Sequence, residues 1–116
     1  MKLKCAVVGM GGIGNTHAKC YYENPLSELV AVCDLVKEKA DAAAEKFGVR
    51  AFYDLEDMLK NMPEIDIVSV TTSGYDNGSM HFEPAMIALD YKKNVLVEKP
   101  ICADINDARE MVKYAA

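Results

Sequence analysis

The sequence predicts an α/β domain built on a doubly wound parallel sheet. Short apolar segments alternate with segments whose apolar residues recur at helical spacing, throughout the 116 residues. The apolar segments are nearly continuous, which is typical of parallel strands covered on both faces. A glycine-rich turn directly follows the first of them. Right-handed crossovers between such strands then predict a three-layer α/β/α arrangement with strand order 3-2-1-4-5.

The N-terminal half predicts two strand–helix pairs. Gly9 ends the first strand, and the breaker Asn24-Pro25 ends the helix that follows it. The second helix carries its apolar residues at i, i+4, i+7, i+8 and i+11, which places them in one stripe, and Gly48 is its natural stop. The predicted elements are strand 3–8, helix 13–21, strand 29–33 and helix 36–47.

The C-terminal half continues the same alternation. Asp54 and Asp104 each stand directly before a helical segment and are good N-caps. Pro84 is tolerable only in the first turn of its helix. The stretch 72–79 is polar and rich in turn formers, and it is long enough to be a functional loop. The predicted elements are strand 51–53, helix 55–61, strand 65–71, helix 84–89, strand 95–97 and helix 105–115.

Composition and charge exclude several classes of function. Hydrophobic residues make up 51% and charged residues 27%, with four prolines, as in an ordinary globular protein, so we expect residues 1–116 to form one domain. The net charge is −5 and the basic residues are scattered, so we expect neither nucleic acid nor a membrane surface as a partner. No segment resembles a signal peptide or a transmembrane span, so we expect a soluble, cytoplasmic protein.

The glycine-rich turn has the spacing of a dinucleotide-binding fingerprint. In the GxGxxG pattern the first glycine permits a tight turn, the second lets a pyrophosphate approach the backbone, and the third brings helix against strand. The N-terminus of the helix adds about half a positive charge facing the phosphates. A plain chain-reversing turn is the alternative, but the position between a buried strand and a helix favours a Rossmann-type domain. The residues are Gly9, Met10, Gly11, Gly12, Ile13 and Gly14.

Asp34 is the candidate for recognition of the adenosine ribose. It stands twenty residues after Gly14, where the second predicted strand ends. A carboxylate there can accept hydrogen bonds from both ribose hydroxyls, and it would repel the extra phosphate of NADP. The sequence therefore favours NAD as the cofactor over NADP. The alternatives are a solvated carboxylate at a strand end and a cap for the following helix.

Glu98-Lys99-Pro100 follows the fifth predicted strand, at the edge where ligands of parallel sheets bind. A lysine beside the nicotinamide could move a proton to or from an oxygen during hydride transfer. A surface ion pair that closes the strand explains the same spacing equally well.

The remaining titratable residues of interest form no metal set. The two histidines lie in different segments. We expect His17 to pack near the first turn of its helix, whereas His81 follows the polar loop, where its ring could contact cofactor or substrate. The cysteines show no CxxC pair and no metal-ligand spacing, so we expect structural thiols. They are Cys5, Cys20, Cys33 and Cys102.

Segments 7–17, 29–34 and 81–100 together resemble the N-terminal domain of the Gfo/Idh/MocA family, which includes glucose–fructose oxidoreductase and inositol dehydrogenase. The resemblance covers the whole chain and is most specific where a histidine opens a helix that leads through a strand into Glu-Lys-Pro. It implies that Lys99 is catalytic and that Glu98 helps to hold the nicotinamide ribose. The loop 71–80 is longer than the usual family turn and lacks its proline. By the same resemblance, the cofactor path is lined by Thr71, Thr72, Ser73 and His81.

The resemblance further implies hydride transfer between the nicotinamide and a sugar, an inositol or a related polyol. Family members carry the substrate site on a second α+β domain that has no counterpart in this sequence. We therefore expect part of a longer oxidoreductase that binds NAD but turns over little by itself, and a homo-oligomer is compatible with this. One alternative is a non-catalytic NAD-binding or sensing module that acts through a partner chain. Another keeps the fold but reduces a non-sugar carbonyl or an imine, as a biliverdin reductase-like relative would.

Overall fold

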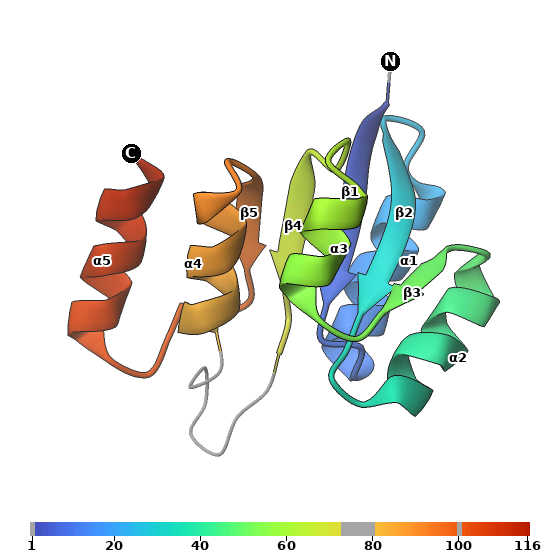
Figure 1. Ribbon diagram of the computed structural model, residues 1–116, viewed down its shortest axis with the longest axis horizontal. Coiled ribbons are helices and arrows are strands. Elements are labelled where there is room, and N and C mark those ends of the chain that lie inside the picture. Colours follow the sequence, from blue (N-terminus) through green and yellow to red (C-terminus); the bar gives the residue numbers. More distant parts are fainter. Residues whose placement is uncertain (1, 73–80, 100) are drawn as a thin grey trace.

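The computed structural model describes residues 2–72, 81–99 and 101–116. These residues form a five-stranded parallel sheet in the order β3-β2-β1-β4-β5, with five helices (Figure 1). The predicted α/β class and the strand order 3-2-1-4-5 are confirmed. The elements are β1 (Leu3–Val8), α1 (Gly12–Glu23), β2 (Ser27–Cys33), α2 (Lys37–Phe47), β3 (Arg50–Phe52), α3 (Leu55–Asn61), β4 (Ile67–Val70), α4 (Phe82–Asp90), β5 (Asn94–Val97) and α5 (Ile105–Ala115).

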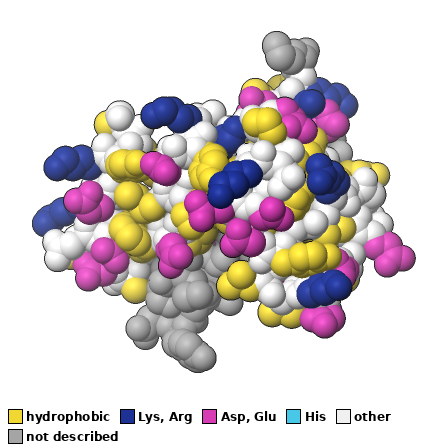
Figure 2. Space-filling view, in the orientation of Figure 1, with side chains coloured by type: hydrophobic (Ala, Val, Ile, Leu, Met, Phe, Trp, Pro, Cys, Tyr) yellow, Lys and Arg dark blue, Asp and Glu magenta, His cyan; other side chains and the backbone are white. Residues whose placement is uncertain are grey.

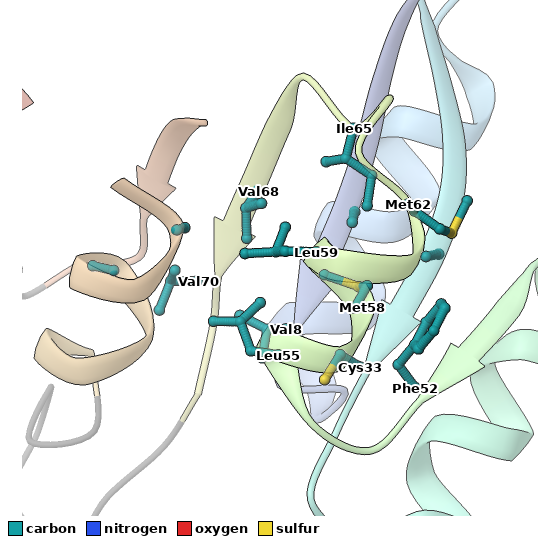
Figure 3. Close-up of a cluster of buried hydrophobic side chains, with 14 of the residues drawn as sticks. Val8, Cys33, Phe52, Leu55, Met58, Leu59, Met62, Ile65, Val68 and Val70 are labelled. Atoms are coloured by element: carbon teal, nitrogen blue, oxygen red, sulfur yellow. The ribbon is translucent and has the colours of Figure 1, made fainter. Parts of the chain in front are cut away.

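Alternate residues of the central strand β1 serve two separate cores. Ala6 and Val8 belong to a cluster with α3 and α4, whereas Val7 belongs to a second cluster with α1 and α2. Figure 3 shows the first cluster, in which Leu59 of α3 lies against Val68 of β4. In Figure 1, α3 lies in front of the sheet and α1 behind it. The sheet is therefore the middle layer of three, as predicted.

The end of the molecule formed by β5 and α5 has fewer buried side chains than the rest of the fold. Helix α5 packs mainly against α4, and Met111 is its one buried residue (Figure 1). Ile105 and Val112, which the sequence places in one apolar stripe, are 66% and 65% exposed. Leu96 in the edge strand β5 is 50% exposed. Few buried contacts stabilise this end, so we expect it to open locally at a lower free energy than the rest of the fold.

Several strand boundaries differ from the predicted ones by one or two residues. β2 begins at Ser27 rather than at residue 29, because Ser27 pairs with Leu3 in the parallel register of β1. β3 ends at Phe52 rather than at residue 53. β4 begins at Ile67, although the apolar run starts at Ile65. Ile65 is 1% exposed and lies in the turn after α3, so its apolar character reflects burial in the core and not strand structure.

Loss of the cap of α3 should destabilise the fold measurably. The Asp54 carboxylate accepts a hydrogen bond of 3.0 Å from the backbone N–H of Asp57, and α3 contributes three buried side chains to the core. Asp54→Ala should therefore lower the free energy of unfolding by about 1 kcal/mol, measured by urea denaturation followed by circular dichroism.

Asp104→Ala is the matched control for this prediction. Asp104 caps α5 through the backbone N–H of Asn106 at 2.7 Å, so the substitution removes the same kind of bond from a helix in which Met111 alone is buried. It should fray α5 and change the unfolding midpoint less than Asp54→Ala does. Equal losses in the two variants would show that α5 unfolds in one cooperative unit with the core.

Candidate cofactor site

Two glycines of the turn between β1 and α1 are required by the protein's own packing. Gly9 has φ +96°, and a Cβ on it would lie 2.6 Å from the backbone nitrogen of Thr72. A Cβ on Gly14 would lie 1.8 Å from the carbonyl oxygen of Gly9. The first glycine thus allows the turn, and the third lets α1 approach it, as the GxGxxG pattern predicts.

The other two glycines are not required by packing. A Cβ on Gly11 or on Gly12 would meet no atom within 4 Å, and both residues are exposed. They stand at the N-terminus of α1, where Gly11 is the N-cap and, among the described residues, no side chain caps the helix. Open backbone at a helix N-terminus is the arrangement that accepts a pyrophosphate. The residues present therefore fit the predicted dinucleotide.

Two side chains, Thr71 after β4 and Asn15 in α1, make hydrogen bonds to backbone carbonyl groups of this turn. The Thr71 hydroxyl, directly after β4, lies 2.7 Å from the carbonyl oxygen of Gly9 and 3.0 Å from that of Val8. The Asn15 amide nitrogen in α1 donates to the carbonyl oxygen of Gly11 at 2.8 Å. Thr71 therefore supports the turn itself, a role that the sequence did not indicate, while its contact with the cofactor stays a prediction.

Asp34 lies beside the turn at the end of β2. One of its carboxylate oxygens accepts from the backbone N–H of Met10 at 2.7 Å, and the other accepts from that of Val36 at 2.8 Å. Val36 is the N-cap of α2, and among the described residues no side chain caps this helix, so Asp34 contacts the residue before the helix without capping it. Each carboxylate oxygen can accept more than one hydrogen bond, so these contacts leave capacity for ribose hydroxyls.

A cavity of about 540 Å³ opens at this edge of the sheet. Its volume is in the range of small-molecule sites. Seven of the predicted site residues line it: Gly9, Gly11, Gly12, Ile13, Asp34, Thr71 and Thr72.

Several further residues of the cavity were not predicted from the sequence. They lie between β2 and the first turn of α2, between β3 and the start of α3, or on α4, so the rule that ligands bind at this edge could have found most of them. Leu35, which is 80% exposed, gives the rim near Asp34 apolar character. The missed residues include Leu35, Val36, Lys39, Asp54, Leu55, Glu83, Pro84 and Ile87.

Five predicted residues in the described part of the chain do not line this cavity: Met10, Gly14, His81, Glu98 and Lys99. Met10 is buried in the turn, and Gly14 is buried in the first turn of α1, where it approaches Gly9 closely. His81 is 3% exposed at the N-cap of α4, and its contact with the cofactor stays a prediction. Ser73 lies outside the described residues.

Glu98 and Lys99 stand directly after β5, as predicted, and the partner of Glu98 is a residue of α1. The backbone N–H of Glu98 donates to Val70 at 3.0 Å, which continues the pairing of β5 with β4. Nε2 of His17 lies 2.8 Å from Oε2 of Glu98, and the backbone N–H of Lys99 donates to Oε1 at 3.2 Å. The hydrogen bond from His17, and after it the one from Lys99, lowers the pKa of Glu98. Lys99 itself is exposed.

The expectation that His17 packs near the first turn of its helix is therefore wrong. The reason is the strand order, which places β4 and then β5 beside β1 and so brings the end of β5 within reach of α1. Because an ionised carboxylate only accepts hydrogen bonds, Nε2 of His17 carries the hydrogen in this contact.

The cysteines are free in the structure, but they do not all pack in the core. Burial raises the pKa of Cys5 to about 11 and that of Cys33 to about 12. Cys33 lines the cavity, yet it stays protonated near neutral pH and is a poor nucleophile. Cys20 is exposed on α1, and Cys102 is half-buried.

The described residues form neither a metal-binding cluster nor a membrane-spanning helix. No group of three or more His, Cys, Asp or Glu residues is placed to hold a metal ion among residues 2–72, 81–99 and 101–116. Over those residues, no helix has the length and apolarity to span a membrane. Figure 2 shows one face of the molecule, on which basic and acidic side chains are interspersed.

Comparison with known proteins assigns the family. Residues 3–116 match the Gfo/Idh/MocA family, described as an oxidoreductase family with an NAD-binding Rossmann fold. The chain belongs to this family. The resemblance inferred from the three sequence segments is thereby confirmed, and so is the prediction of an NAD-binding oxidoreductase domain.

Similar proteins act on sugars and polyols, according to their names. An inositol 2-dehydrogenase from Salmonella typhimurium is 33% identical over 117 residues, which cover 97% of this chain and 33% of that protein. Myo-inositol dehydrogenase from Lactobacillus casei, solved with NAD(H) and myo-inositol, is 30% identical with a TM-score of 0.87, covering 98% of this chain and 33% of that one. The WlbA dehydrogenase from Bordetella pertussis, solved with NADH and UDP-GlcNAcA, is 28% identical with a TM-score of 0.90, covering 99% and 34%. The chain thus spans about a third of the length of these proteins.

Proposed function

We propose that residues 1–116 form the cofactor domain of a longer dehydrogenase that binds NAD across the carboxyl edge of its sheet and acts on a sugar, an inositol or a related polyol. The observation that carries the proposal is the contrast among the glycines. Gly9 and Gly14 are closed in by backbone, whereas Gly11 and Gly12 leave open space at the N-terminus of α1. Packing within the protein does not explain why glycine stands at these two open positions. The close approach of a pyrophosphate to the backbone does explain it.

The adenosine half of the cofactor is assigned to the end of β2. Asp34 would accept hydrogen bonds from the ribose hydroxyls, in addition to those it accepts from Met10 and Val36. The exposed side chain of Leu35 offers apolar surface to the adenine at the same rim. A negative charge at this place opposes the added phosphate of NADP, which supports NAD as the cofactor.

The nicotinamide half is assigned to the ends of β4 and β5. Thr71, Thr72, Ser73 and His81 would lie along the cofactor path, and Glu98 would hold the nicotinamide ribose. When bound, the nicotinamide ring supplies hydride chemistry. Lys99 is exposed at the end of β5, so it can reach a substrate oxygen and move a proton to or from it. The names of the relatives support a hydroxyl-bearing substrate of the sugar or polyol class.

Calorimetric titration of the chain with NAD and with NADP, at one ionic strength, tests the proposal. We expect saturable binding of NAD and binding of NADP that is weaker by about tenfold or more, since the Asp34 carboxylate faces the added phosphate. The fixed ionic strength matters because charge repulsion is screened by salt. A chain that binds neither dinucleotide, or binds NADP more tightly, would contradict the proposed site.

A further inference from the structure

The contact between His17 and Glu98 joins two parts of the site that lie far apart in the sequence. The residues are separated by 81 positions, and their side chains meet at 2.8 Å. His17 lies on α1, whose N-terminus is the proposed pyrophosphate site. Glu98 follows β5, next to the proposed catalytic lysine. The contact therefore bridges the phosphate-binding helix and the catalytic segment, across the end of β4.

The Glu98 carboxylate is held at both oxygens. His17 occupies Oε2, and the backbone N–H of Lys99 occupies Oε1. The side chains of His17 and Glu98 are 15% and 29% exposed, so water competes with their hydrogen bond only in part. Long acidic side chains at a surface normally sample several rotamers, and fixing one of them requires a partner of this kind.

We propose that His17 is a positioning residue, which fixes the Glu98 carboxylate and the backbone of Lys99 relative to the N-terminus of α1. The inference rests on the proposed function, in which Glu98 holds the nicotinamide ribose. Removing the His17 donor leaves Glu98 with the contact to Lys99 and frees its side chain to rotate. The affinity for the nicotinamide half should fall, while the adenosine and pyrophosphate contacts remain, since they depend on Asp34 and on the glycine turn.

Two substitutions separate the hydrogen bond from the bulk of the side chain. His17→Gln keeps a nitrogen donor at a similar reach, whereas His17→Met keeps length and volume without a donor. Both are titrated with NAD and with ADP, which lacks the nicotinamide ribose. We expect His17→Met to bind NAD about tenfold more weakly than the wild-type chain, because a freely rotating Glu98 loses its hydrogen bond to the nicotinamide ribose, and a hydrogen bond to a charged group is worth about this much. His17→Gln should restore NAD binding to within about twofold, and all three chains should bind ADP alike.

A double-mutant cycle with Glu98→Gln tests whether His17 acts through Glu98. Glu98→Gln alone should weaken NAD binding, and His17→Met should add little in that background. In the cofactor-free chain, the amide NMR resonances of Glu98 and Lys99 should move in His17→Met and return toward their wild-type positions in His17→Gln.

Each contrary result has its own meaning. Equal losses of NAD and ADP affinity in His17→Met would show that the histidine only supports the structure of α1, and the inference would be overturned. Unchanged NAD binding in His17→Met, or losses that add fully in the cycle, would overturn it as well. A wild-type chain that binds neither NAD nor ADP would instead overturn the proposed function on which the inference rests.

Discussion

Gly14→Ala is expected to lower the free energy of unfolding by about 3 kcal/mol and to abolish NAD binding. The new Cβ would lie 1.8 Å from the carbonyl oxygen of Gly9 and 2.9 Å from the Thr71 hydroxyl oxygen. The first of these is a backbone atom in a turn that β4 and α1 hold in place, so α1 has to move away from the sheet. Urea denaturation and calorimetric titration with NAD measure the two effects.

Gly12→Ala is the matched control, two residues earlier on the same helix. A Cβ there meets nothing within 4 Å, and Gly12 is the first residue of α1. The substitution should leave stability unchanged or raise it by about 0.4 to 1 kcal/mol, because alanine restricts the unfolded chain. NAD binding should nevertheless weaken, since the Cβ takes up space proposed for the pyrophosphate. A Gly14→Ala chain as stable as Gly12→Ala would contradict the close approach of α1 to the turn.

Asp34→Ala is expected to weaken NAD binding by about tenfold to a hundredfold. A hydrogen bond to a charged group contributes roughly 1.5 to 3 kcal/mol, and each 1.4 kcal/mol corresponds to about tenfold in affinity. The substitution also removes the acceptor that holds the Met10 N–H at 2.7 Å, so the glycine turn loses one of its supports. Titration with NAD gives the size of the loss.

Asp34→Asn separates the charge from the turn contact. Asparagine keeps one oxygen that can accept from either Met10 or Val36, but it carries no charge. Its affinity for NAD should fall between those of the wild-type and alanine chains, and the preference for NAD over NADP should narrow in both variants. A loss below about twofold in Asp34→Ala would rule out the proposed ribose contact.

Local sequence signals placed most of the secondary structure. Gly48 adopts the left-handed conformation with φ +67° that a helix stop requires, and Asp54 and Asp104 accept the N-cap hydrogen bonds predicted for them. These signals act over one helical turn, so they can be read without knowledge of the fold. The start of β4 was misplaced because an apolar run marks burial, and Ile65 is buried in a turn.

The glycine turn and Asp34 were also predictable, since their spacing follows from one strand–helix–strand unit. Thr71 was assigned a cofactor contact by resemblance, whereas its observed hydrogen bonds support the turn from the neighbouring strand. That role depends on β4 lying next to β1, a pairing between residues distant in sequence.

The sequence by itself determined the alternation of strands and helices, the phosphate-binding turn and the acidic residue that follows it, because each is encoded within a short stretch of chain. Only the tertiary structure decided that His17 meets Glu98, that α5 lies mostly exposed against α4, and that Gly11 and Gly12 face open space while Gly9 and Gly14 do not. These features depend on the packing of segments that the strand order brings together. Periodicity along the chain carries no information about which side chains then come into contact.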